Sequence, residues 1–413
     1  MTMAVDKKRL QAEIDALALI TEAQPPVVTR VIFSEADLRG RAYVKKLCRE
    51  AGLVLREDAV GNIFARWPGS QKNLPAVATG SHIDAIPNAG KYDGVVGVLG
   101  ALEAIRALKK SGFQPQRSLE LIIFTSEEPT RFGIGCLGSR LLGGVLPPVK
   151  AAALKDRAGK NLESWRQHGG CHGQLSSVRL RKNVYAAFVE LHIEQGPVLE
   201  QENVAIGVVE KIAAPCTLRI QLTGVGGHAG ATLMPGRRDA LLAGAEIALA
   251  VERIATTSGS PDTVGTTGIF RIEPGAVNSV PCHAHLEIDL RDTNVKTRDA
   301  ALKRIEAAVK KICAARKIKY VLERLNVDPP AVCDSTLVKT VSEICRTAHI
   351  SCKRMISRAY HDSLFMAQIC PTTMIFIPCR KGYSHRPDEF SSPKQIATGV
   401  QILAKVLAEL ASR

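Results

Sequence analysis

The alternation of apolar and polar positions divides this chain into regions of different structure. In the first region, short continuous apolar runs alternate with segments whose apolar residues recur every three to four positions. These patterns predict buried strands at 74–81, 118–126 and 184–192 and a helix at 94–112. Strands and helices in this order predict an open α/β sheet, in which ligands bind beyond the carboxyl ends of the strands.

The pattern changes near Ile212. More exposed strands with alternating polarity are interleaved there with two helical segments, which predicts a small α+β domain that ends near Asp328. The predicted elements are strands at 216–224, 262–273 and 282–292 and helices at 237–255 and 297–315.

The last part of the chain returns to the first pattern. A helix at 335–348, a strand at 372–378 and a closing helix at 392–410 fit the first sheet. We therefore expect the α/β class, with a discontinuous α/β catalytic domain that contains an open mixed sheet and an inserted α+β lid domain. The expected boundaries are 1–211 and 329–413 for the catalytic domain and 212–328 for the lid.

Composition supports this division and narrows the function. With 413 residues, the chain is too long for one ordinary core. The net charge of +15 raises the question of nucleic-acid binding, but the basic residues are scattered and form no long run. We interpret them as a solvated basic surface that attracts small anionic substrates, and we expect no nucleic-acid partner.

Cysteine usage and hydropathy bear on the compartment. The eleven cysteines are an odd number and include no CxxC pair, which favours reduced thiols in a cytosol-like compartment. No apolar run is long enough for a membrane span, so no membrane partner is expected. The N-terminal segment indicates an amphipathic helix rather than a signal peptide. We expect a cytoplasmic protein, or one of the endoplasmic reticulum if an N-terminal extension was removed.

Residues with metal-ligand chemistry follow the apolar strands. They are His82, Asp93, Glu127, Glu128, His192 and His385. Imidazole and carboxylate together suit Zn, Mn or similar divalent ions, and one extra carboxylate can take a proton from water. Each residue alone has a simpler interpretation, but their shared position after strands predicts a two-metal hydrolytic site.

Two of the histidines are each followed two residues later by an acid. In His82 and Asp84, the acid either caps a turn or orients the ring of a metal ligand, and His192 and Glu194 repeat this arrangement. Asp93 stands just before a helix, where a carboxylate is favoured in any case. Adjacent strand residues point to opposite faces, but at a strand end two adjacent carboxylates can turn to one crevice. One of the two glutamates would then bind metal and the other accept a proton.

Other polar residues allow several interpretations. His228 could hydrogen-bond a substrate oxyanion or be an ordinary surface histidine. Asn278 is a similar case, and Arg291 at a strand end could clamp a substrate carboxylate. The His-Asp-Ser run at 361–363 hints at a serine hydrolase, but the G-x-S-x-G elbow is missing.

Several longer phrases resemble one enzyme family. From about Asp37 to the end, the chain is similar to the amidase/hydantoinase/carbamoylase family of dinuclear metal amidohydrolases, and most of all to its plant-type ureidoglycolate branch. The phrases that carry this resemblance are GSHIDAIPNAGKYDGVVGVLGALEAI, TSEEPTRFGIGCLGSR, ELHIEQGPVLE, GGHAGATLMPGRRDA, PGAVNSVP, AYHDS and MIFIPCRKGYSHRPDEFSSP.

This resemblance implies an activity. It implies hydrolysis of a linear amide or ureido C–N bond, foremost that of (S)-ureidoglycolate to glyoxylate, ammonia and carbon dioxide in allantoin degradation. Hydrolysis of N-carbamoyl-L-amino acids or of allantoate is the alternative. A non-catalytic binding protein on the same scaffold is a third possibility, which loss of a ligand or of the base would favour.

The resemblance also implies roles for single residues. His82, Asp93 and His192 would hold one divalent ion, and Asp93, Glu128 and His385 the other, with Asp93 bridging. Mn is the metal implied, with Zn, Co and Ni as alternatives.

The remaining roles implied by the resemblance concern catalysis and substrate. Glu127 matches the general base, and His228 matches a residue that reaches into a partner's active site in a homodimer formed through the lid domain. The substrate, a small anionic ureido acid, would contact Gln195, His228, Asn278, Arg291 and His361, and we add Tyr383 as a candidate.

Overall fold

A computed structural model describes residues 3–413 and divides them into two compact units. The larger unit contains the residues up to Glu210, Val332–Met355 and His361–Arg413, and the smaller contains Lys211–Ala331 and Ile356–Tyr360. The sequence-based boundaries at 211/212 and 328/329 differ by a few residues and left 356–360 in the larger domain. The division into a catalytic domain and a lid stays a prediction about function.

Four parallel strands form the centre of the large sheet. They are adjacent in the order β17 (Thr372–Ile377), β7 (Tyr185–Ile193), β4 (Ala76–His82) and β6 (Leu119–Phe124). Parallel strands that are covered on both faces are continuously apolar, and all residues of β4, β6 and β17 are buried. The carboxyl ends of the four strands therefore meet at one edge of the sheet.

Antiparallel strands extend this centre on both sides. On the β6 side follow β3 (Ile63–Trp67) and β2 (Val54–Glu57), and on the β17 side β8 (Ile206–Ile212). The short β15 (Ala331–Val332) lies next to β8 at the edge of the sheet. A further strand, β16 (Cys352–Ser357), also pairs with β8. The mixed sheet confirms the predicted α/β class.

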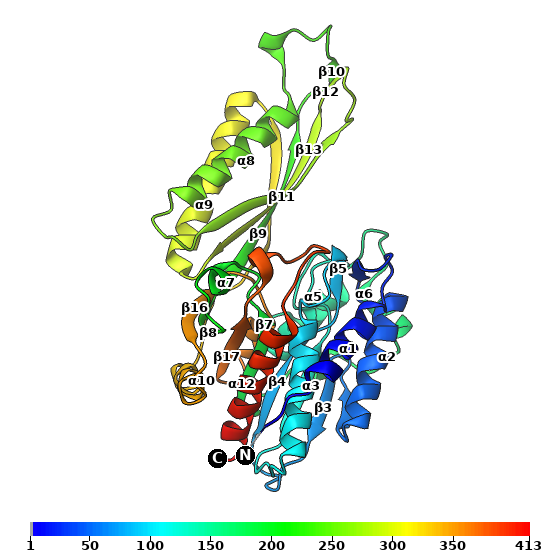
Figure 1. Cartoon of the computed structure of the whole chain (residues 1–413). Coiled ribbons are helices and arrows are strands. Elements are labelled where there is room, and N and C mark those ends of the chain that lie inside the picture. Colours follow the sequence, from blue (N-terminus) through cyan, green and yellow to red (C-terminus); the bar gives the residue numbers. More distant parts are fainter. Residues whose placement is uncertain (1–2) are drawn as a thin grey trace. The chain divides into compact units, whose positions relative to one another are not determined.

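Helices cover the central strands. α3 (Val95–Lys110) and α12 (Pro393–Ala411) pack against each other and on β4, β7 and β17 (Figure 1, cyan and red). α3 is apolar on nearly all sides, as expected for a helix between a sheet and other helices. The predicted N-terminal helix, α1 (Lys7–Ala18), packs on α3, and Arg106 of α3 pairs with its Glu13 at 2.8 Å.

A large core cluster lies under β6 and β7. It joins Phe124 and Phe188 of these strands to α4 (Leu137–Leu142) and α11 (Ser363–Met366). The remaining elements of the larger unit are β1 (Val28–Arg30), α2 (Glu35–Glu50), β5 (Ala85–Ala89), α5 (Pro148–Ala152), α6 (Leu162–His168), η1 (Leu175–Ser177), α7 (Val198–Gln201), α10 (Ser335–Thr347) and η3 (Arg380–Gly382).

The smaller unit is an antiparallel sheet with two helices on one face. The strand order is β11 (Val264–Glu273), β13 (His283–Asp292), β9 (Ala214–Thr223) and β14 (Lys319–Val327). The inward side chains of β9 and β13 form a separate core with the two helices. The helices are α8 (Ala240–Thr256) and α9 (Val295–Arg316), and the short β10 (Gly227–His228), β12 (Ser279–Val280) and η2 (Met234–Gly236) complete the unit.

The predicted strands and helices of this region are confirmed, but β14 was not predicted. Its residues are mostly exposed, so its sequence lacks the apolar alternation of a half-buried strand. Within residues 3–413, none of the helices combines the length and apolarity that crossing a bilayer requires.

Candidate metal centre and active site

The parallel strands bring the predicted ligands to one edge of the sheet. His82 is the last residue of β4, and His192 stands near the end of the neighbouring β7. Glu127 and Glu128 follow β6 shortly after its end, where Phe124 lies opposite His82. His385 comes from the loop after β17. These residues lie far apart in sequence and meet because their strands are neighbours.

Asp93 lies between two groups of ligands and turns one oxygen to each. Its Oδ1 is 3.2 Å from His192 Nε2 and 3.6 Å from His82 Nε2. Its Oδ2 is 3.2 Å from His385 Nε2, which lies 3.3 Å from Glu128 Oε1. We call His82, His192 and Asp93 Oδ1 the inner half-site, and Asp93 Oδ2, Glu128 and His385 the outer half-site.

These separations fit a pair of divalent ions. Ligand atoms that each lie about 2.1 Å from a tetrahedral ion are about 3.4 Å from one another. Both half-sites hold three nitrogen or carboxylate ligand atoms within 4.8 Å of one another. The donor set therefore suits a metal, and Asp93 is placed to bridge two ions.

Backbone carbonyl groups, rather than acids, hold the two inner rings. His82 Nδ1 lies 2.9 Å from the carbonyl oxygen of Asp84, and His192 Nδ1 lies 2.9 Å from that of Ile193. The Asp84 carboxylate is 3.7 Å from His82 Nδ1. The nearest acceptor is therefore the backbone that turns past each ring, and a role of the acid side chains at 84 and 194 in orienting the rings stays a prediction.

The two acids bind backbone N–H groups instead. Asp84 accepts hydrogen bonds from the backbone of Glu127 at 3.2 Å and of Glu128 at 3.1 Å. It therefore holds the peptide that carries both glutamates. Glu194 accepts from Val198 and Leu199 at the start of α7 and contributes to that helix rather than to the cluster.

A glycine is required next to Asp93. Gly94 has a φ of 65°, in the region that L side chains rarely adopt. A Cβ at this position would lie 2.5 Å from His82 Nε2. The Asp-Gly pair thus allows the Asp93 carboxylate and the His82 imidazole to approach each other.

Glu127 stands beside the cluster with no ligand role in either half-site. Its Oε2 lies 3.8 Å from His82 Nε2, and its Oε1 accepts the thiol of Cys136 at 3.4 Å. Burial, with the nearby charges of Glu128, Asp362 and Asp93, raises the pKa of Glu127 well above its usual range, although His82 opposes this. A buried carboxylate with a raised pKa suits proton transfer.

The remaining charges favour a cation at the centre. Burial opposes ionisation of Asp93, yet hydrogen bonds from His192, His385 and His82 lower its pKa well below the usual range. Asp93 and Glu128 raise the pKa of His385 to about 11. The imidazoles thus attract protons strongly here, as expected where carboxylates are arranged to hold positive charge.

Gln195 and two residues missed in the sequence analysis support the outer half-site. Gln195 Nε2 donates to Asp93 Oδ2 at 2.7 Å and faces the hydroxyl of Ser384 at 3.1 Å. Ser384 in turn contacts Asp93 Oδ2 and Glu389. Burial raises the pKa of Glu389 to about 7. The only sequence signal for Glu389 was its place in the phrase that contains His385, between exposed Asp388 and half-buried Phe390.

His361 lies at the same edge of the sheet. Its ring centroid is 4.5 Å from that of His192, and both rings are buried. Glu190 could complete a third ligand group with these two, but His192 Nε2 already faces Asp93. The serine-hydrolase interpretation is not supported, because Ser363 donates its hydroxyl proton to Glu190 at 2.5 Å.

Tyr383 belongs to the loop of His385. Its ring is covered by the guanidinium of Arg386, 3.8 Å from the ring centroid. A role in substrate binding stays a prediction.

Three predicted substrate contacts lie in the smaller unit. His228 and Asn278 are exposed neighbours, joined by a hydrogen bond from Ala229 N to the Asn278 carbonyl at 2.8 Å. Arg291 is engaged by Asp289 through two hydrogen bonds of 2.7 and 3.0 Å. To bind a substrate carboxylate, Arg291 must either keep only part of its hydrogen bonding to Asp289 or give it up. Their contacts with substrate stay predictions.

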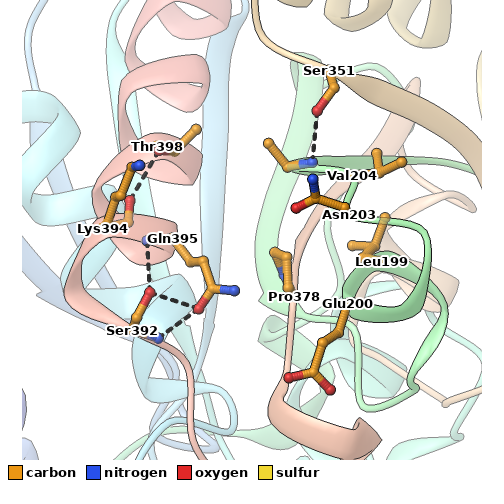
Figure 2. A pocket seen from close by; sticks show the side chains of 11 residues that line it. Leu199, Glu200, Asn203, Val204, Ser351, Pro378, Ser392, Lys394, Gln395 and Thr398 are labelled. Carbon is orange, nitrogen blue, oxygen red and sulfur yellow. Dashed lines mark hydrogen bonds between the residues drawn. The ribbon is translucent and has the colours of Figure 1, made fainter.

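A pocket of about 470 Å³ is lined by none of the residues of the two half-sites (Figure 2). Pro378 and Ser392, at the two ends of the loop that carries His385, both line it. Its polar groups bind one another: Gln395 Oε1 accepts from Ser392, and Ser351 Oγ accepts from the backbone of Ala205. Among residues 3–413, no group of potential metal ligands lines this pocket, so the two half-sites form the candidate site.

Comparisons with known proteins agree with this geometry. The chain is 54% identical over 416 residues to a ureidoglycolate hydrolase of Arabidopsis thaliana, with 99% of this chain and 87% of that protein covered. It is 34% identical to an N-carbamoyl-L-amino acid amidohydrolase of Geobacillus stearothermophilus, with 98% and 99% covered. A crystal structure of AtUAH in complex with glyoxylate matches with a TM-score of 0.95 and 54% identity, covering 99% of this chain and 98% of that chain.

A family model described as peptidase family M20/M25/M40 matches residues 78–409. This range contains both half-sites and Glu127. The chain therefore belongs to peptidase family M20/M25/M40, and its expected similarity to amidohydrolases is confirmed.

Proposed function

We propose that the chain is a metal-dependent amidohydrolase that cleaves ureidoglycolate. The observation that carries this proposal is the Asp93 carboxylate, which faces His82 and His192 with one oxygen and His385 with the other. The substrate follows from the 54% identity to a ureidoglycolate hydrolase, against 34% to an N-carbamoyl-L-amino acid amidohydrolase.

The reaction needs activation of water and of a ureido carbonyl. Two divalent ions would polarise the carbonyl and make water more acidic. We propose Mn as the native metal, with Zn, Co and Ni as alternatives. The ligands would be His82, Asp93, Glu128, His192 and His385.

Glu127 would transfer the proton. Its Oε2 points toward the cluster, while its Oε1 is held by Cys136, so the carboxylate is fixed with one free basic oxygen. It would accept a proton from the attacking water and deliver it to the leaving nitrogen. His228 would stabilise the oxyanion that forms at the carbonyl.

Residues of both units would bind the substrate. Arg291 and Asn278 are suited to its carboxylate, and Gln195 and His361 lie beside the ligands. The net charge of +15 would attract the small anion over longer distances.

We further propose a homodimer formed through the smaller unit. β11 and β14 are the edge strands of its sheet. The segments around β10 and β12 expose Val225, Leu233, Met234 and Val277, which a monomer would leave in water. In such a dimer, His228 would serve the partner's site. The eleven cysteines, unpaired within residues 3–413, fit a reducing compartment, and we propose the cytoplasm.

The proposal is tested by measuring ammonia release from purified protein loaded with Mn. Ureidoglycolate, allantoate and several N-carbamoyl-L-amino acids are compared at equal concentration, with Glu127→Gln as the control for the base. We expect the highest kcat/KM with ureidoglycolate and a loss of about 10²–10⁴-fold in the variant, with unchanged metal content. A preference for another substrate would reassign the specificity, and full turnover in the variant would remove the role of Glu127.

A further inference from the structure

The buried carboxylate of Glu389 has no role in the proposed reaction. It lies in the loop between β17 and α12, shortly after His385, and is 4% exposed. Its Oε1 accepts hydrogen bonds from the backbone of Tyr92 at 2.9 Å and of Asp93 at 3.0 Å. Its Oε2 lies 2.8 Å from the hydroxyl of Ser384.

These contacts join two distant segments of the chain. Tyr92 and Asp93 are 297 and 296 residues away from Glu389 in sequence. The Ser384 hydroxyl also lies 3.0 Å from Asp93 Oδ2. Asp93 is thus held through its backbone by Glu389 and through its side chain by Ser384. The same loop presents His385, the other partner of Asp93 Oδ2.

The chain leaves room for this carboxylate. A Cβ on Gly90 would lie 2.5 Å from the Glu389 Cβ and 2.7 Å from its Oε1. A buried carboxylate is costly unless hydrogen bonds replace its water, and the two backbone N–H groups provide them. The missing side chain of Gly90 and the two backbone N–H donors are independent features. Both favour a carboxylate at the position of Glu389.

We propose that Glu389 is a positioning residue for the outer half-site. By tying the Asp93 segment to the His385 loop, it sets the separation of Asp93 Oδ2 and His385 Nε2 at a value that an ion can span. The inner half-site depends less on this tie, because it shares only Asp93 with the outer half-site and its two rings are held by nearby backbone carbonyl groups. This inference rests on the proposed dinuclear function.

The test is metal binding without substrate. Glu389→Ala removes the tie, and Glu389→Gln keeps an oxygen for the two backbone N–H groups. Asp388→Asn is the matched control, because exposed Asp388 contacts the Arg386 side chain instead. Mn alone is titrated into each metal-free protein by equilibrium dialysis, and the number and affinity of bound ions are read from total Mn and from the electron paramagnetic resonance signal.

We expect the alanine variant to keep the first ion and to bind the second about 10–100-fold more weakly. The glutamine variant should lie between it and the parent, and the control should equal the parent. Two ions bound by folded Glu389→Ala with parental affinities would overturn the inference, even if that variant unfolds at a lower temperature, since Glu389 would then be only a structural tie.

If the alanine variant does not fold, Ser384→Ala decides. It removes the contacts to Asp93 Oδ2 and Glu389 Oε2 but leaves the backbone hydrogen bonds, and we expect a smaller weakening of the second ion. A parental second-ion affinity in this variant would count against the inference. A parent chain that binds two Mn ions but does not cleave ureidoglycolate would count against the proposed substrate alone. A parent that binds fewer than two ions would remove both proposals.

Discussion

The two half-sites share one carboxylate but are built in different ways. The inner half-site takes both imidazoles from buried parallel strands, and His82 and His192 are 2% and 1% exposed. The outer half-site takes its imidazole from a loop, and the side chain of His385 is 49% exposed. Ligands on a sheet are fixed by its hydrogen bonds, whereas a loop ligand depends on side-chain ties.

The two half-sites also differ in the groups that hold their ligands in place. In the inner half-site, each ring nitrogen that faces away from the cluster meets a carbonyl of its own strand end. In the outer half-site, Asp93 is held by Gln195, which follows β7, and by Ser384 and Glu389 of the His385 loop. We therefore expect the inner half-site to bind its ion more tightly.

The largest effect should come from the shared residue. Asp93→Ala removes one ligand from each half-site at once and leaves three imidazoles beside Glu127 and Glu128. We expect loss of both ions. The fall in kcat should exceed the about 10–100-fold that is typical when a residue that hydrogen-bonds a metal ligand is removed. Metal analysis after gel filtration and an ammonia assay measure this. Retention of two ions would show that Asp93 does not bridge.

Substitution of His385, which lies in a loop, and of buried His192 should affect metal binding and stability differently. His385→Ala is expected to leave one Mn per chain, whereas His192→Ala should lose the inner ion and also destabilise the fold, because it empties a buried position. Metal content and thermal unfolding of the metal-free variants provide the comparison. A remaining Mn ion bound as tightly by His192→Ala as by His385→Ala would contradict the proposed order of affinities.

Asp84 should affect rate more than metal binding. Because its carboxylate holds the backbone of Glu127 and Glu128, Asp84→Ala is expected to displace the base and lower kcat by about 10–100-fold. The ring of His82 keeps its carbonyl partner, so the inner ion should remain. Unchanged kcat would show that the two glutamates are held by other contacts.

Glu194 should give the smallest effect, although it has the same place after a histidine as Asp84. Its carboxylate binds two N–H groups of the short helix α7, so Glu194→Ala should cost about 0.5–2 kcal/mol of stability, as for a lost helix cap. Denaturant unfolding and kcat measure the two effects. A fall in kcat as large as that of the Asp84 variant would support the prediction that Glu194 orients His192.

The sequence by itself determined the elements and the chemistry. Apolar runs were sufficient to predict β4, β6, β7 and β17, and the polar residues after them pointed to a metal site, because parallel strands end at one edge. Only the tertiary structure decided which groups hold the ligands. The partners of Asp84 and Glu389 are backbone N–H groups, which every residue except proline carries and which leave no mark in a sequence. Those of Glu389 lie almost 300 residues away, so no local pattern could reveal them.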